Sequence, residues 1–261
     1  MQAFFNLLNL VPNALAATWI FIGTSWLNEK AIDFGSSNTT KYISMGDNFN
    51  FSWTDDFTMC AWFYAHSAWE APLFSRENGS TGNGWDFRYT SANKLQWYSS
   101  GSSAARRIQV TSSGTFSTGT WRHICFVYTG NQSATGISFV VDGSAVSTTT
   151  NFDTSTEDWA QASINFRVNA WSNLTTYGRA KMDEITIWND NLSTSEIGEL
   201  ISGGKPTNPV TTSMWATKNL SYYRMGDLTD STSTIVDRGM TGGVDGTPTA
   251  LVSGDIVTSV P

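Results

Sequence analysis

The segment Lys181–Gly204 constrains the fold most, because its hydrophobic period changes within a few residues. Ile185 and Ile187 alternate with other residues at the period of two that is typical of a strand with one buried face. Ser193 and Glu196 then have the spacing of a capping box, in which each side chain bonds the other residue's backbone at the start of a helix. The segment therefore predicts a core strand followed directly by a short helix. The apolar face of that helix and its glycine stop are predicted at Ile197, Leu200, Ile201 and Gly203–Gly204.

Short strand-like segments recur along the chain roughly every 8–15 residues, separated by turns rich in Gly, Asn and Ser. Residues 57–64 are apolar on both faces, which predicts a central, fully buried strand. Asp142-Gly143 suits a tight hairpin turn with positive φ. This pattern predicts an all-β, antiparallel sandwich. Further strands are predicted at 31–35, 42–47, 72–76, 85–89, 94–98, 108–110, 121–128, 137–143 and 164–168.

Composition narrows the class of protein. The chain has 261 residues, enough for a large single core, and 13% of them are aromatic. A net charge of −7 argues against nucleic acid as a partner. Cys60 and Cys125 each lie in an apolar strand pattern, and we expect them to be buried, reduced thiols.

Several of these segments resemble one family. Lys-x-Asp-Glu-Ile-x-Ile-Trp-Asn followed by Leu-Ser-x-x-Glu-Ile, with Phe-Thr-hydrophobic-x-Ala-Trp from Phe57 and Trp-x-His-hydrophobic from Trp121, resembles laminin-G-like jelly rolls. These belong to the concanavalin A-like lectin and glucanase family. The resemblance covers about residues 31–204 and implies an antiparallel jelly-roll β-sandwich with one short helix after the closing strand.

The segment 205–261 follows a break at Lys205–Pro209 and resembles the piece that usually opens such a domain, as if the domain were circularly permuted. Its strand can complete the chain's own sandwich or a neighbour's, and both alternatives are open. The Tyr-Arg-Met-Gly-Asp motif within residues 223–227 also resembles laminin-G-like proteins of tailed-phage virions.

Residues 1–30 form an apolar N-terminal arm with no charged residue before Glu29. A secretory signal is disfavoured because the segment lacks a basic start, and no apolar run is long enough for a membrane span. Such a patch usually marks a partner interface, although packing on the chain's own sandwich is the alternative. The residues that we expect to be buried in a neighbour are Phe4, Phe5, Leu7, Leu8 and Leu10.

The sequence argues against an enzyme. The glucanase relatives carry Glu-x-Asp-x-x-Glu on one strand, and this triplet is not in the sequence. Asp183 and Glu184 are adjacent, so in a regular strand they point to opposite faces and do not form a catalytic pair.

The resemblance also implies two kinds of site. Related sandwiches often hold one structural Ca²⁺, for which Asp183 and Asp33 occupy the matching positions; the alternative is that Asp183 accepts backbone N–H groups. Carbohydrate binding is the other implied function, with an aromatic platform as its means; the alternative is that these rings lie in the core. The candidate platform residues are Trp85, Trp97, Tyr98 and Trp171.

Three functions are considered. We predict that the chain is a non-catalytic structural protein of a phage virion, and that it is homo-oligomeric. Its role would be that of a capsid decoration or head-surface protein, anchored by its arm to capsid or other virion proteins. The alternative is a glycan-binding module or receptor-binding tail adhesin that contacts cell-surface glycans. An enzyme of the glucanase kind is the third.

Overall fold

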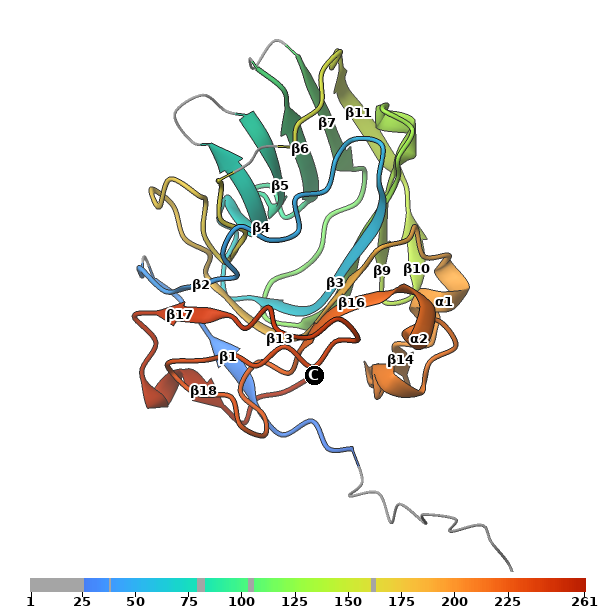
Figure 1. Cartoon of the computed structure of the whole chain (residues 1–261). Helices are drawn as coiled ribbons and strands as arrows, with labels where there is room; N and C mark the ends of the chain where they lie inside the picture. Colours follow the sequence, from blue (N-terminus) through green and yellow to red (C-terminus); the bar gives the residue numbers. More distant parts are fainter. Residues whose placement is uncertain (1–25, 38, 79–82, 103–105, 161–162) are drawn as a thin grey trace, which may run out of the picture.

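The computed structural model describes residues 26–37, 39–78, 83–102, 106–160 and 163–261. It is a sandwich of two eight-stranded sheets whose ladders are all antiparallel (Figure 1). This confirms the predicted all-β sandwich. In the described part of the chain, no helix is long and apolar enough to cross a membrane.

The first sheet contains the closing strand and the predicted central strand. Its spatial order is β10 (Ser144–Val146), β9 (Ile137–Val141), β8 (Trp121–Thr129), β3 (Asp56–Ala65), β13 (Ala180–Trp188), β1 (Ala31–Asp33) and β18 (Ile256–Val257), while β16 (Asn219–Tyr223) also pairs with β13. β3 lies between β8 and β13 and is buried along almost its whole length, as predicted from its apolar faces.

The second sheet carries the polar face described below. Its order is β11 (Thr148–Asp153), β7 (Arg107–Ser112), β6 (Leu95–Ser100), β5 (Asn83–Tyr89), β4 (Ala71–Asn78), β12 (Arg167–Val168), β2 (Tyr42–Ser44) and β17 (Thr247–Thr249). The smaller elements are a hairpin of β14 (Ile201–Ser202) and β15 (Lys205–Pro206), the helices α1 (Thr194–Gly198) and α2 (Trp215–Lys218), and the 3₁₀ turns η1 (Ala134–Gly136), η2 (Pro209–Thr211) and η3 (Ser253–Asp255).

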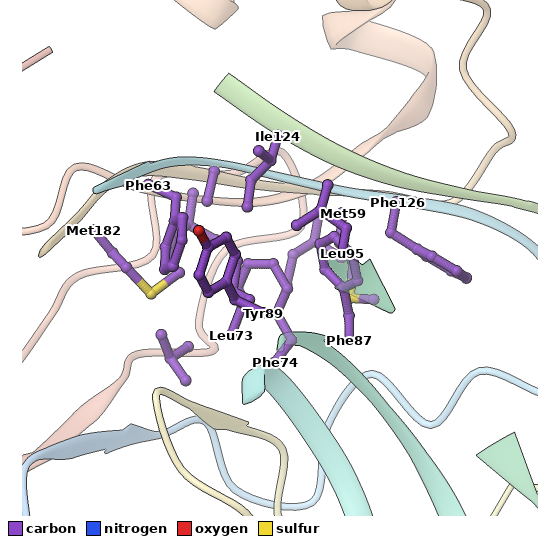
Figure 2. Packing of buried hydrophobic residues seen from close by; sticks show 14 of the residues in the cluster. Met59, Phe63, Leu73, Phe74, Phe87, Tyr89, Leu95, Ile124, Phe126 and Met182 are labelled. Atoms are coloured by element: carbon purple, nitrogen blue, oxygen red, sulfur yellow. The ribbon is translucent and has the colours of Figure 1, made fainter. Parts of the chain in front are cut away.

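An aromatic core fills the space between the sheets. Figure 2 shows Phe63 and Ile124 from the first sheet pointing toward Phe74 and Phe87 from the second. The rings pack closely, since the centroids of Trp97 and Phe126 lie 4.0 Å apart with the rings nearly parallel. Large aromatic side chains bury more apolar surface than other residues, so this layer dominates the stability of the sandwich.

A second apolar layer covers the outer face of the first sheet. It packs α1, α2 and their flanking segments on β3, β8 and β13. Here Cys60 and Cys125 are direct cross-strand partners, with Cα atoms 4.1 Å apart, and they form a disulfide. The expectation of reduced thiols was wrong, because strand register places the two side chains against each other.

The capping box is present as predicted. The Ser193 hydroxyl accepts the Glu196 N–H at 3.2 Å, and the Glu196 carboxylate accepts the Ser193 N–H at 2.8 Å. The helix that it starts is shorter than predicted and ends at Gly198. Gly203 and Gly204, both at positive φ, form the turn between β14 and β15 and do not stop the helix.

The C-terminal segment pairs with strands of its own chain. β16 pairs with β13, β18 pairs with β1, and β17 joins the other sheet beside β2. Figure 1 shows these orange and red strands among the blue and yellow ones at one end of the sandwich. Of the two open alternatives, this structure has the segment completing its own sandwich.

Candidate functional site

The outer face of the second sheet gathers polar and aromatic side chains on β5 and β6. Strand alternation sends Trp85 and Phe87 into the core, so Asp86, which lies between them, and Arg88, which follows Phe87, lie on the outer face. On the neighbouring strand Tyr98 lies directly opposite Asp86 and shares its face. The site therefore follows from the same period of two that builds the core.

Arg88 is the centre of this face. Its guanidinium makes two hydrogen bonds to the carboxylate of Asp86, and its Nη1 lies 3.1 Å from a carboxylate oxygen of Glu70. Asp86 is fully buried, whereas the Glu70 side chain is about half exposed. Two carboxylates thus fix one guanidinium from two directions.

Two half-buried rings flank the same guanidinium. The Cζ atom of Arg88 lies 5.4 Å from the ring centroid of Tyr98 and 5.3 Å from that of Trp171. Tyr98 comes from β6, and Trp171 comes from the loop that follows β12. Both distances are within the range of a cation–π contact, so the arginine joins a strand residue to a loop residue.

Burial raises the pKa values of two carboxyls at this face. Burial raises the pKa of Glu77 to about 7, and the charge of Asp86 adds to this rise. Burial also raises the pKa of Asp86, against the opposing charge and hydrogen bonds of Arg88. Burial alone would lower the pKa of Arg88, but the charge of Asp86 more than offsets it and raises that pKa.

Hydrogen-bonding side chains extend the face on both sides. On β6 the amide of Gln96 donates to the hydroxyl of Thr111 on β7 at 2.8 Å. On β12 the guanidinium of Arg167 donates to the backbone carbonyl of Ser172 at 2.8 Å, which holds the loop that carries Trp171. Amide and hydroxyl groups that both donate and accept hydrogen bonds suit a polar, uncharged ligand.

The structure separates the four predicted platform residues. Tyr98 and Trp171 come together around Arg88, but Trp85 and Trp97 are fully buried in the core. The assignment of Trp85 and Trp97 to a glycan platform was wrong, because both rings point between the sheets. Sequence reasoning also missed Trp69, which is 38% exposed and stacks on Arg179, since its loop has no hydrophobic period.

The predicted calcium ligands do not share a partner. In the register of β1 and β13, Asp33 pairs with Lys181, so Asp183 lies diagonally two residues away. Asp33 accepts the Gly35 N–H and pairs with His66, each at 2.8 Å. Asp183 is fully buried; its oxygens accept the Asn28 amide and the Glu184 N–H, each also at 2.8 Å.

The oxygen atoms near Asp183 fit a hard cation in type. The side-chain oxygen of Asn28 is buried and has no hydrogen-bond partner, although the same amide group bonds Asp183. Burial raises the pKa of Asp183 well above its ordinary value, and the charges of Glu184 and Asp227 raise it further. An oxygen-lined position short of positive charge has the chemistry that Ca²⁺ prefers. Asp33 pairs with His66 and does not contact Asp183, so calcium binding by these residues stays a prediction.

The prediction that Asp183 and Glu184 point to opposite faces of a regular strand was wrong. A β-bulge lies between Asp183 and Thr186 in the pairing with β3, and Glu184 has a φ of 47°. Met182 and Ile185 enter the core, while both carboxyls lie on the other side of the sheet. The bulge brings the two carboxyls together, but both are buried under the outer layer.

The predicted partner-binding residues Phe4, Phe5, Leu7, Leu8 and Leu10 lie outside the described residues. The anchoring role of the arm therefore stays a prediction.

Comparison with known families identifies the fold family. A family model described as the concanavalin A-like lectin/glucanases superfamily matches residues 36–198. The chain belongs to the concanavalin A-like lectin/glucanase superfamily. In this superfamily fold, the match spans β2 to α1 and so contains Arg88, Tyr98 and Trp171. A search of curated proteins finds no match.

Several solved structures are similar to this chain at low sequence identity. A candidate carbohydrate binding protein from Bacteroides ovatus has a TM-score of 0.54 and 16% identity; the alignment covers 89% of this chain and 60% of that protein. A heptameric SAP-like pentraxin from Limulus polyphemus has a TM-score of 0.47 and 13% identity, covering 69% and 87%. The CBM40 of a Ruminococcus gnavus sialidase, solved with α2,3 sialyllactose, has a TM-score of 0.46 and 12% identity, covering 67% and 98%.

Proposed function

We propose that the chain is a glycan-binding module whose binding surface is the outer face of β5 and β6. Tyr98 and Trp171 supply apolar ring faces against which a sugar ring can pack, and the amides of Gln96 and Gln109 on the same face can bond its hydroxyls. Membership of a lectin and glucanase superfamily supports this function, as does the fold shared with the Bacteroides ovatus protein.

The observation that carries the proposal is the way Arg88 holds the two rings. Its guanidinium is bonded to Asp86 and Glu70 while it lies against Tyr98 and Trp171. The rings are therefore positioned before any ligand arrives. A preorganised surface avoids part of the conformational entropy cost of binding, which matters for weakly bound ligands such as sugars.

We also propose that this face binds without cleaving. The carboxyls on offer are Asp86, Glu77 and Glu70, and glycoside hydrolysis needs two carboxyls with separate roles. Both oxygens of Asp86 are bonded to Arg88 and buried, so this carboxylate is not available as a nucleophile or base. Release of reducing ends from an oligosaccharide that the protein binds would overturn this part of the proposal.

A glycan array followed by calorimetry on the best ligand tests the proposed function. We expect saturable binding that Tyr98→Ala and Trp171→Ala each weaken at least tenfold. Leu228→Ala serves as the matched control, because Leu228 is 72% exposed and follows β16 of the other sheet. Binding that both aromatic variants retain at full strength would place the site elsewhere, and no binding on a broad array would refute the function.

We further propose that Asp183 and Asn28 hold one structural Ca²⁺. The ion would supply positive charge to the buried carboxyl of Asp183, because Arg224 pairs with Glu184 and Asp227 and, among the described residues, no cation pairs with Asp183. Thermal unfolding with millimolar Ca²⁺ and with EDTA tests this, and we expect a higher midpoint with Ca²⁺. Equal midpoints, or an increase that Asp183→Asn retains, would contradict it.

A location in a phage virion is a separate proposal. It is supported by the resemblance of residues 223–227 to virion proteins and by the uncharged arm. Such a protein would act as a decoration protein or a tail adhesin. Detection of the chain in purified particles by mass spectrometry tests this location, and its absence from them would refute it.

A further inference from the structure

Two cysteines and a histidine meet on the outer face of the first sheet. Cys60 of β3 lies directly opposite Cys125 of β8, and Trp62 lies opposite His123 two residues further along. Residues two apart on a strand share a face, so His123 and Cys125 point the same way. The Sγ atoms of both cysteines and a ring nitrogen of His123 all lie within 4.8 Å of one another. All three residues are buried.

The imidazole of this group is held in place. Its Nδ1 atom lies 3.8 Å from Sγ of Cys125, and its ring packs on that of Trp62, with the centroids 5.4 Å apart. The turn between β9 and β10 fixes the backbone at His123: the carboxylate of Asp142 accepts the His123 N–H at 3.0 Å, and the Asp142 N–H donates to the His123 carbonyl at 2.8 Å. A side chain that is already oriented loses little conformational entropy when it binds a ligand.

A small cavity adjoins the imidazole. Its volume is about 10 Å³, which is room for about one water molecule, and its walls include Trp62, His123 and Thr186. Thr186 lies opposite Cys60 in the pairing of β13 with β3, so this wall belongs to the residue beside the cysteine. The cavity also reaches Thr207, which is half-buried, and this gives a small solute a direction of entry.

The bond between the two sulfurs determines whether this group can bind a metal. In this structure Cys60 and Cys125 form a disulfide, whereas the form of cysteine that binds metals is the thiolate. A phosphine reductant supplies two electrons to the S–S bond, which breaks; the two sulfurs take two protons from water, and the oxygen of that water ends on phosphorus as the phosphine oxide. A dithiol reductant supplies the same electrons and protons and leaves as its own disulfide.

We propose that, once this disulfide is reduced, Cys60, Cys125 and His123 bind one Zn²⁺ ion, with a water in the adjoining cavity as the fourth ligand. Zn²⁺ takes thiolate and imidazole ligands in tetrahedral sites, and binding releases the two thiol protons. Sulfur and nitrogen donors favour this ion over Ca²⁺ or Mg²⁺.

The net charge of the complex suits its surroundings. One Zn²⁺ with two thiolates and a neutral imidazole is uncharged, and the outer layer that covers the two cysteines is apolar. A buried net charge would be costly there, but a neutral complex avoids that cost. The layer residues closest in sequence to the ends of α1 and α2 include Leu192, Leu200 and Met214.

The proposed site gives one pair of residues two ways to join β3 and β8. Under oxidising conditions the disulfide links the strands, and under reducing conditions the bound ion links them. The proposal goes beyond glycan binding and does not depend on it, because Arg88 and its two rings lie on the second sheet.

A Co²⁺ titration of the full chain tests the site. The protein is reduced anaerobically with a phosphine, in urea that is then dialysed away, and a thiol assay confirms two free cysteines. We expect one Co²⁺ per chain, with thiolate-to-metal charge-transfer absorption and the strong visible bands of tetrahedral Co²⁺, both lost when Zn²⁺ displaces it. The disulfide form should show neither.

Each other result of this titration is decisive. The same response from both forms, or binding without charge-transfer absorption, would overturn the proposal; oxygen ligands such as those near Asp183 give no such absorption. A reduced chain that refolds only when Zn²⁺ is present would support the site, because binding would then supply folding free energy. A reduced chain that fails to refold with or without Zn²⁺ would overturn it.

The two histidines of the chain provide a matched pair of variants. In the reduced protein His123→Gln should weaken Co²⁺ binding about tenfold or more and shift the visible bands. His66→Gln should change neither, because His66 pairs with Asp33 and does not contact the cysteines. Equal binding by the two variants would overturn the assignment of His123. The comparison of reduced and disulfide forms needs no substitution, so it decides the proposal even if His123→Gln does not fold.

Discussion

Replacing Arg88 by methionine should destabilise the protein through the carboxyl that it leaves behind. Asp86 is fully buried, and Arg88 is the only cation that hydrogen-bonds its carboxylate among the described residues. Removing one partner of a buried ion pair costs about 3–5 kcal/mol, because the other charge remains without compensation. With a urea m-value of about 3 kcal/mol/M for a chain of this size, the unfolding midpoint should fall by about 1–1.7 M.

The loss of stability in Arg88→Met should depend on pH. In the native protein burial raises the pKa of Asp86 while Arg88 opposes the rise, so in Arg88→Met the pKa of Asp86 rises further. A carboxyl whose pKa is higher in the folded than in the unfolded chain loses stability as the pH rises above the unfolded value near 4. The deficit should therefore be small at pH 4 and grow toward pH 8.

Urea unfolding of both proteins at pH 4, 6 and 8 measures the effect. The matched control is Arg122→Met, because Arg122 pairs with Asp142 at 2.6 Å with both side chains more than a third exposed. Such an exposed pair contributes about 0–1 kcal/mol. A deficit in Arg88→Met below about 1 kcal/mol at pH 8, or one that does not change with pH, would refute the argument that Asp86 is a buried, charge-compensated carboxyl.

Three further predictions concern stability. Replacing both Cys60 and Cys125 by serine should cost about 4 kcal/mol in urea unfolding, since the disulfide spans 65 residues; a loss under 1 kcal/mol would contradict a formed disulfide. Trp97→Ala should cost about 3–5 kcal/mol and Trp69→Ala less than 1, because only Trp97 is buried; equal losses would contradict the core assignment. Burial raises the pKa of Glu77 to about 7, so the wild-type protein should lose stability as the pH rises from 4.5 to about 7. Glu77→Gln should not show this decrease, and an unchanged pH profile would argue against the prediction.

The elements that sequence predicts well are those set by local pattern. The placement of Ile185 and Ile187 of β13 in the core and the capping box at Ser193 both depend on residues a few positions apart, and both are present. The turn at Asp142-Gly143 is of the same kind: both residues have positive φ, as predicted. These features need no knowledge of the partner strand.

The errors come from register and from local irregularity. The disulfide depends on how β3 and β8 align, and no pattern within either strand states that alignment. The bulge at Glu184 shifts every later side chain of β13 relative to β3. The adjacent carboxyls of Asp183 and Glu184 therefore lie on the same face, whereas in a regular strand they would lie on opposite faces. Trp97 and Tyr98 are adjacent in sequence, and only the orientation of β6 decides which one faces the core.

The pairing of β1 with β18 has a consequence for the ends of the chain. Ala31 lies opposite Val257, so the first and last described strands are neighbours. Joining residue 26 to residue 261 by a short linker and opening the chain at a distant hairpin such as Asp142-Gly143 should leave the sandwich able to fold. Deleting the last six residues would instead remove β18 and leave β1 as the edge strand of its sheet. A bare edge strand invites pairing with another molecule, so we expect such a truncated chain to aggregate.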